Sequence, residues 1–300
     1  MMTQITPDNK EHWLQLRSQD ITSTDCAALF GLSKYKTLFE LWHEKKENVV
    51  YSIEENERMK WGSRLEPVIA QGLADDKGWQ IEPKKDYYRI DDLRAGSSFD
   101  FFITNENALL EIKNVDGLIY KREWSEDEAP AHIELQVQHQ LLVSGLSKAY
   151  ICALVGGNEV KLIERSRDKK IIDSIIKKIA AFWKSIEENN PPKPDYERDA
   201  EFIISQYSFA EPGKVYAGSD LESIKKYVLK YKRAGDLEKK IKAVKDKMKA
   251  HILEIIQDSE KVKAEEFSIS AGIVGEKTVS YTSRAYRDFR IFLKNKNENS

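Results

Sequence analysis

The segment SSFDFFITNENALLEIKNVDG, residues 97–117, constrains the fold of this chain more than any other. Two runs of strand-forming residues flank the turn-forming Asn-Glu-Asn, so the segment predicts a β-hairpin. Charged residues interrupt both runs, Asp100 in the first and Glu111 and Lys113 in the second. Because side chains alternate faces along a strand, Glu111 and Lys113 should point the same way while Ile112 points into the core.

The two carboxylates of this hairpin pose an electrostatic problem. Asp100 and Glu111 lie on neighbouring strands, and carboxylates that converge there repel and raise one pKa unless a cation neutralises them. Oxygen ligands without cysteine or clustered histidine favour Mg²⁺ or Mn²⁺ over zinc. Lys113 would then orient a metal-bound water, help it lose a proton or stabilise charge on a phosphate. The alternative is a surface salt bridge on an exposed strand face.

Two further segments carry polar residues on helices that otherwise read as apolar. Glu66 lies in WGSRLEPVIAQ, and a core-facing Glu66 would need a partner such as a metal. Gln136 opens QVQHQLL and shares a helix face with Ile133 and Val137, so its amide could bond a phosphate or a catalytic water. The alternatives are a solvated Glu66 and a solvent-facing Gln136.

A third segment, LRSQDITSTD, places Arg17 ahead of the hydroxyls of Ser23 and Thr24 and of a helix start. A guanidinium, hydroxyls and a helix N-terminus together suit a phosphate monoester. The alternative is plain N-capping of the helix by Ser23 or Thr24.

Taken together, the four segments resemble the YqaJ-type viral recombinase family, which includes lambda exonuclease and belongs to the PD-(D/E)xK nucleases. The matching pattern is L-R-x(3)-I-T-x-T, then G-x-x-x-E, then the hairpin D-x(10)-E-x-K, then Q-V-Q-x-Q, over roughly residues 10–195. The resemblance implies an α/β (α+β) restriction-endonuclease-like core with a central mixed β-sheet flanked by helices. It also implies a Mg²⁺-dependent 5′–3′ exonuclease that resects one strand of linear duplex DNA for single-strand annealing.

Site residues follow from the resemblance position by position. It implies four catalytic residues: Asp100, Glu111, Lys113 and Gln136. It implies ligands for Mg²⁺ or Mn²⁺, two ions per site: Glu66, Asp100 and Glu111. It implies contacts to the 5′-phosphate: Arg17, Ser23 and Thr24. The family often has Ser in place of Thr24, and Pro in place of Phe99, changes that keep the hydroxyl and the neighbouring carboxylate.

The resemblance further implies duplex DNA ends as substrate and a single-strand-annealing recombination protein as partner. It implies a homo-oligomer, with the ring-shaped trimer as the family's example. The net charge of −2 is compatible with a ring that is basic inside and acidic outside. No apolar run approaches the roughly 18 residues that span a bilayer, and no signal peptide is recognised, so a cytoplasmic protein without membrane contact is expected. Cys26 and Cys152, the two cysteines, exclude a four-thiolate cluster.

Other functions are compatible with the same residues. An endonuclease and a Cas4-like end-processing nuclease would share the fold, although the cluster cysteines of the latter are missing. A catalytically silent DNA-binding or assembly module is the non-enzymatic alternative, against which the intact Asp100, Glu111 and Lys113 speak. We interpret His132 and His139 as residues of a polar helix face and not as zinc ligands.

The proline-rich segment NNPPKPDYERD predicts a boundary between an exonuclease domain, 1–196, and a C-terminal helical extension, 197–300. In the extension, a helix over about 219–256 carries a coiled-coil-like apolar stripe and, between 221 and 256, eleven Lys and Arg against five Asp and Glu. This helix would bind the DNA backbone, pack on a neighbouring subunit or have a solvated face. FSISAG and KTVSYTSRAYRDFRIF predict a terminal strand pair.

In the first domain, a helix over about 56–77 should kink or restart at Pro67.

Overall fold

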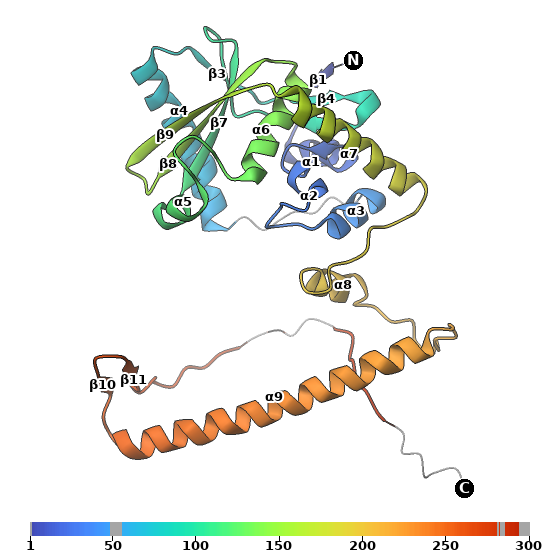
Figure 1. Cartoon of the computed structure of the whole chain (residues 1–300), viewed down its shortest axis with the longest axis vertical. Helices are drawn as coiled ribbons and strands as arrows, with labels where there is room; N and C mark the ends of the chain where they lie inside the picture. The colour runs from blue at the N-terminus through green and yellow to red at the C-terminus, as the bar shows by residue number, and fades with distance from the viewer. Residues whose placement is uncertain (1, 49–55, 281, 283–285, 294–300) are drawn as a thin grey trace. The chain divides into compact units, whose positions relative to one another are not determined.

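The computed structural model describes residues 2–48, 56–280, 282 and 286–293 of the chain. Contacts divide the chain into two compact units, residues 1–203 and 204–300. The division falls inside helix α8, a few residues after the proline-rich segment in which the sequence pattern predicts a boundary. Both units are seen in Figure 1.

The helices of the first unit begin and end at ordinary capping signals. Thr37 and Glu40 form a reciprocal capping box, and Gly78 ends a helix in the left-handed conformation. Pro67 lies inside a helix that runs on without a restart, and a kink at Pro67 stays a prediction. The helices are α1 (Lys10–Gln19), α2 (Cys26–Leu29), α3 (Leu38–Glu47), α4 (Glu57–Lys77), η1 (Asp91–Leu93), α5 (Gly117–Glu123), α6 (Ala131–Ser144), α7 (Lys169–Glu187) and α8 (Ala200–Gln206).

Strands of the first unit form two sheets. One has the order β3-β6-β7-β8-β9, in which β7 and β8 are parallel and all other neighbours antiparallel. The other has the order β1-β4-β5-β2, in which β5 and β2 are parallel. The strands are β1 (Met2–Ile5), β2 (Ile21–Thr22), β3 (Ile81–Pro83), β4 (Tyr87–Ile90), β5 (Ala95–Ser97), β6 (Phe101–Ile103), β7 (Ala108–Val115), β8 (Lys148–Val155) and β9 (Glu159–Ser166).

Helices cover both faces of the five-stranded sheet, with α4 on one face and α6 on the other (Figure 1). Leu110 and Ile112 of β7 pack with Ile69 of α4. Leu109 of the same strand belongs to the larger core cluster that includes α6 and α7. Because strand side chains alternate, Glu111 shares the face of Leu109 and so points toward α6.

The second unit contains one long helix, α9 (Leu221–Ile256), in which no residue is buried. Its short hairpin pairs β10 (Lys261–Lys263) with β11 (Ser268–Ser270) in antiparallel register. The expected partner of FSISAG was the segment 277–292, and this pairing is wrong, because the described residues of that segment form no strand. β11 pairs instead with β10, which precedes it and is joined to it by the short loop 264–267, so little chain entropy is lost on closure.

The expected fold class, a mixed sheet flanked by helices, is confirmed. The expected helical extension is present as α9, but its hairpin is followed by the described residues 271–280, 282 and 286–293, which form no strand. Among the described residues, no helix combines the length and the apolar character that crossing a membrane requires.

Candidate active site

Glu111 lies at the centre of the candidate site. It stands in the middle of β7 and is 3% exposed, yet each of its oxygens accepts hydrogen bonds from side chains. Gln136 Nε2 donates to Oε1 at 2.6 Å, and Gln140 Nε2 donates to Oε2 at 2.6 Å. The Lys113 ammonium also lies 2.5 Å from Oε1. Because Gln136 and Gln140 are one helical turn apart on α6, one helix face supplies both amides.

Asp100 reaches the same place from the other strand of the hairpin. It directly precedes β6, and its Oδ2 accepts the backbone N–H of Ile112 at 2.8 Å, which ties it across the hairpin. Its neighbour Phe99 is buried and stacks on Tyr88 with ring centroids 4.9 Å apart. Burial raises the pKa of Asp100 well above its usual range, and the nearby Glu111 carboxylate raises it further.

Glu66 approaches from α4 and is half-buried. Burial raises the pKa of Glu66, the Glu111 carboxylate raises it further, and the Lys113 ammonium opposes both effects. For Lys113 the balance runs the other way: burial lowers its pKa, but Glu111 and Asp100 raise it by more, so the net shift is upward. The Lys113 ammonium is therefore favoured by its acidic neighbours Glu111, Asp100 and Glu66.

These groups have the charge and chemistry that suit a divalent cation. Three mutually repelling carboxylates face one ammonium, so an added positive charge would relieve the repulsion that raises the pKa values of Asp100 and Glu66. All three offer oxygen ligands, the kind that Mg²⁺ and Mn²⁺ prefer. Across the described ranges, no three His, Cys, Asp or Glu side chains already form a metal-holding group. An ion that binds Glu111 Oε1 would therefore displace an amide or ammonium donor.

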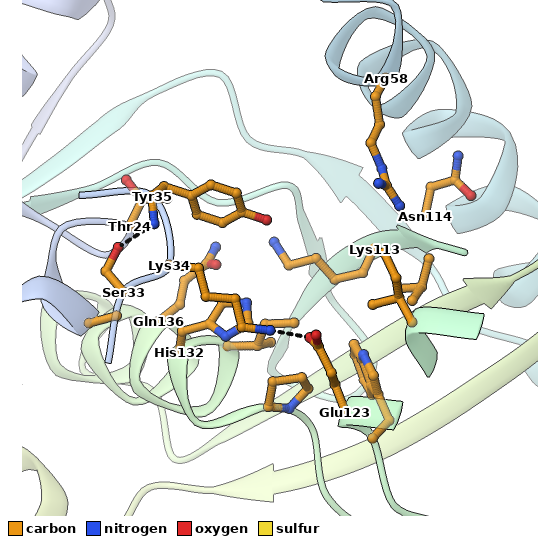
Figure 2. Close-up of a pocket in the computed structure, with 16 residues that line it drawn as sticks. Thr24, Ser33, Lys34, Tyr35, Arg58, Lys113, Asn114, Glu123, His132 and Gln136 are labelled. Atoms are coloured by element: carbon orange, nitrogen blue, oxygen red, sulfur yellow. Dashed lines mark hydrogen bonds and ion pairs between the residues drawn. The ribbon is translucent and has the colours of Figure 1, made fainter. Parts of the chain in front are cut away.

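A cavity of about 330 Å³ opens beside Glu111. Lys113 and Gln136 line it from the Glu111 side, and Thr24 lines it from the α1–α2 connection. Figure 2 shows the Lys113 ammonium and the Tyr35 hydroxyl pointing toward one another across this space. An ion pair between Lys34 and Glu123 closes another part of the wall (Figure 2). The cavity thus brings three of the sequence-predicted residues to one surface.

Arg17 and Thr24 lie together, as the phosphate-pocket prediction requires. Arg17 Nη2 donates to Thr24 Oγ1 at 2.9 Å, and its guanidinium lies 4.5 Å from the centroid of the Trp13 ring. Ser23 is not with them, because it is buried and its hydroxyl accepts from Ser97 Oγ at 3.1 Å. A contact from Ser23 to a phosphate stays a prediction, for which this structure offers no exposed hydroxyl.

Asp25 holds in place the α1–α2 connection that carries Thr24. Its carboxylate accepts from the Thr22 hydroxyl at 2.8 Å and pairs with Lys45 at 2.9 Å. Burial raises the pKa of Asp25, but the neighbouring Lys45 and Lys36 lower it by more, and the net pKa lies well below the usual range. A fully ionised anchor of this kind keeps Thr24 at the cavity wall.

The sequence patterns did not identify Gln140 as a site residue, and they placed His139 on the wrong kind of helix face. Gln140 contacts Glu111, and its spacing of four residues from Gln136 was the available signal. The interpretation of His139 as a polar-face residue is wrong, since its side chain is fully buried. His132 is partly buried and lines the cavity. Cys26 and Cys152 are free and buried.

Known proteins resemble this chain in sequence and in structure. A family model described as the YqaJ-like viral recombinase domain matches residues 12–147. A protein of Bacillus subtilis (strain 168), called uncharacterized protein YqaJ, is 30% identical over 248 residues, which cover 80% of this chain and 77% of that protein.

Two solved structures resemble the fold more loosely. An alkaline exonuclease (LHK-Exo) from Laribacter hongkongensis has a TM-score of 0.49 at 19% identity, covering 65% of this chain and all of that one. A phage related exonuclease from Haemophilus somnus 129PT has a TM-score of 0.42 at 13% identity, covering 56% and 94%. Structural similarity at this level decides nothing about function. The sequence relative and the matching motifs decide the family: the chain belongs to the YqaJ-like viral recombinases.

Proposed function

We propose that this chain is a Mg²⁺- or Mn²⁺-dependent deoxyribonuclease that degrades one strand of linear duplex DNA from a 5′ end. One observation carries the proposal: Glu111 pairs with Lys113 at 2.5 Å beside an open cavity, and the Asp100 and Glu66 carboxylates raise the pKa of the same ammonium. Membership of a viral recombinase family supports DNA as the substrate. The 5′–3′ direction and the role ahead of single-strand annealing rest on the resemblance of the four motifs to lambda exonuclease.

In this proposal Glu66, Asp100 and Glu111 hold one or two divalent ions. Bound there, the metal would activate a water and offset charge on the phosphodiester. The carboxylates come from a helix and from both strands of a hairpin, so their positions depend on the packing of α4 against β7.

Lys113 pairs with Glu111 Oε1 and lines the cavity. There it would orient a metal-bound water, help that water lose its proton or stabilise negative charge on the phosphate. Gln136 holds Glu111 Oε1 and lines the cavity, where its amide can also contact a water or the scissile phosphate.

Arg17 and Thr24 are proposed to receive the 5′-phosphate. Arg17 carries a fixed positive charge and Thr24 is exposed at the same cavity as Lys113. Arg17→Met should therefore reduce the preference for 5′-phosphorylated over 5′-hydroxyl duplex ends. An equal preference in Arg17→Met and wild type would remove this pocket from the proposal.

The test of the proposed function uses linear duplexes labelled at either end, with a 5′-phosphate or a 5′-hydroxyl, in the presence of Mg²⁺. Early release of the 5′ label supports the proposal. Asp100→Asn should abolish cutting but keep DNA binding, whereas Asp173→Asn, an exposed aspartate of α7 that pairs with Lys169, should cut like wild type. Cutting of closed circular DNA would favour an endonuclease. No cutting by wild type with Mg²⁺ or Mn²⁺ would favour a DNA-binding module.

Assembly belongs to the proposal as well. A homo-oligomer, with a trimeric ring as the model, would keep the nuclease on its DNA, and an annealing protein would receive the exposed strand. Sedimentation at micromolar concentration tests the first point. A monomer with intact processivity would contradict it.

A further inference from the structure

Gln140 is the most deeply buried of the three residues whose side chains hydrogen-bond Glu111. It is 2% exposed, and its Nε2 donates to Glu111 Oε2 at 2.6 Å. Gln136 and Lys113 both contact the other oxygen, Oε1, and both line the cavity, which Gln140 does not. The two oxygens of Glu111 therefore have different surroundings: Oε1 on the cavity side and Oε2 on the protein side.

The terminal torsion of a glutamate is broad, so a buried carboxylate needs donors to fix the orientation of its plane. Its two oxygens are chemically equivalent, and without a donor on the protein side the oxygen that points there would be left buried and unpaired. An unpaired buried carboxylate oxygen is costly. The Gln140 amide removes this freedom by giving Oε2 a fixed donor.

We propose that Gln140 is a positioning residue, whose amide holds Oε2 of Glu111 and so leaves Oε1 as the oxygen available to a divalent cation. This inference rests on the proposed function, since it concerns the same site. Gln140 acts through Glu111 and touches neither substrate nor metal in this scheme.

The chain supplies a matched control on the same helix. Gln138 is also a glutamine of α6 and is 3% exposed. Its amide donates to the Ser166 carbonyl at 2.8 Å and its side-chain oxygen accepts from the Asp168 N–H at 2.9 Å. Gln138→Met and Gln140→Met thus remove the same atoms at the same burial, but only Gln140→Met releases Glu111.

The experiment is calorimetric titration of the full chain with Mn²⁺, without DNA, for wild type, Gln140→Met and Gln138→Met, alongside thermal melts in EDTA. Loss of a residue that orients a metal ligand typically costs about 10- to 100-fold in metal affinity. We expect that loss in Gln140→Met, and wild-type affinity in Gln138→Met even where both variants melt earlier.

Equal Mn²⁺ affinity in Gln140→Met and wild type would overturn this inference and leave the proposed function standing. An equal loss in both variants would also overturn it, because a general effect on α6 would then explain the result. Absence of Mn²⁺ binding by wild type would overturn the proposed function, and the inference with it.

A measurement on wild type covers the case in which Gln140→Met does not fold. In protein labelled with ¹⁵N-glutamine, the side-chain amide signal of Gln140 should shift on titration with Mg²⁺, because Glu111 changes its partners. The Gln138 signal should stay in place. If the side-chain amide signal of Gln140 does not shift while backbone signals of β7 do, Gln140 has no positioning role.

Discussion

Replacing Lys113 by methionine tests the electrostatics of the site most directly. In wild type the Lys113 ammonium, whose side chain is 27% exposed, contacts Glu111, whose side chain is 3% exposed, at 2.5 Å. Methionine keeps the apolar stem but removes the charge. Glu111 then keeps its two amide donors and loses its counter-charge, next to the Asp100 carboxylate.

The size of the effect follows from this burial. Removing one partner of a buried ion pair typically costs about 3–5 kcal/mol. The lower end applies, because Lys113 is partly exposed and Gln136 and Gln140 still bond Glu111, which gives about 3 kcal/mol. Unfolding of residues 1–203, at about 2.1 cal/mol/K per residue, has an entropy of about 0.4 kcal/mol/K, so the midpoint should fall by about 7 °C.

The assay is thermal unfolding in EDTA at pH 8, with two controls. Lys161→Met breaks an exposed pair with Glu159 and should shift the midpoint by no more than about 2 °C, since surface pairs contribute little. The double variant Glu111→Gln/Lys113→Met removes both charges and should recover most of the loss. A midpoint for Lys113→Met within about 2 °C of wild type would refute the reasoning, as would a double variant less stable than the single one.

Three further outcomes follow. Because the pKa of Asp100 is raised in the folded state, the folded protein binds that proton more tightly than the unfolded chain, and stability falls as pH rises through the raised pKa. The melting midpoint of metal-free Asp100→Asn should therefore lie above that of wild type at pH 9, and the two midpoints should converge near about pH 4. A lower midpoint for Asp100→Asn at pH 9 would contradict this. Burial lowers the pKa of His139 to about 4 from an ordinary value of about 6.5, so about 3 kcal/mol of folding stability should be lost as pH falls through that window. His139→Leu should lose less stability over the same pH range in denaturant titrations, and equal losses in the two proteins would count against this. Deleting residues 214–300 should weaken DNA binding or assembly while Mn²⁺ binding persists; unchanged digestion of long duplex would contradict this.

Much of the site was readable in the sequence because it follows from local geometry. Strand side chains alternate whatever the strand packs against, so Glu111 and Lys113 had to share a face. The turn in NEN made the hairpin and brought Asp100 to the neighbouring strand. The motif spacing and its resemblance to a nuclease family are the basis for the proposed metal and substrate class.

Other features depended on which helix covers which strand. Gln136, Gln138 and Gln140 are chemically identical and lie on one helix, yet two contact Glu111 and one contacts Ser166 and Asp168. Their roles separate only when α6 docks on the sheet. His139 is buried for the same reason, because a helix covered on most sides has no polar face for it to occupy.

By itself, the sequence determined the strand hairpin, the helices with their caps and the set of charged groups, since each arises from contacts between residues close in the chain. Tertiary structure alone decided that Ser23 turns inward and that Gln140 reaches Glu111. The physical reason is that burial and pairing depend on partners distant in sequence, and residue type and periodicity do not specify how close those partners come.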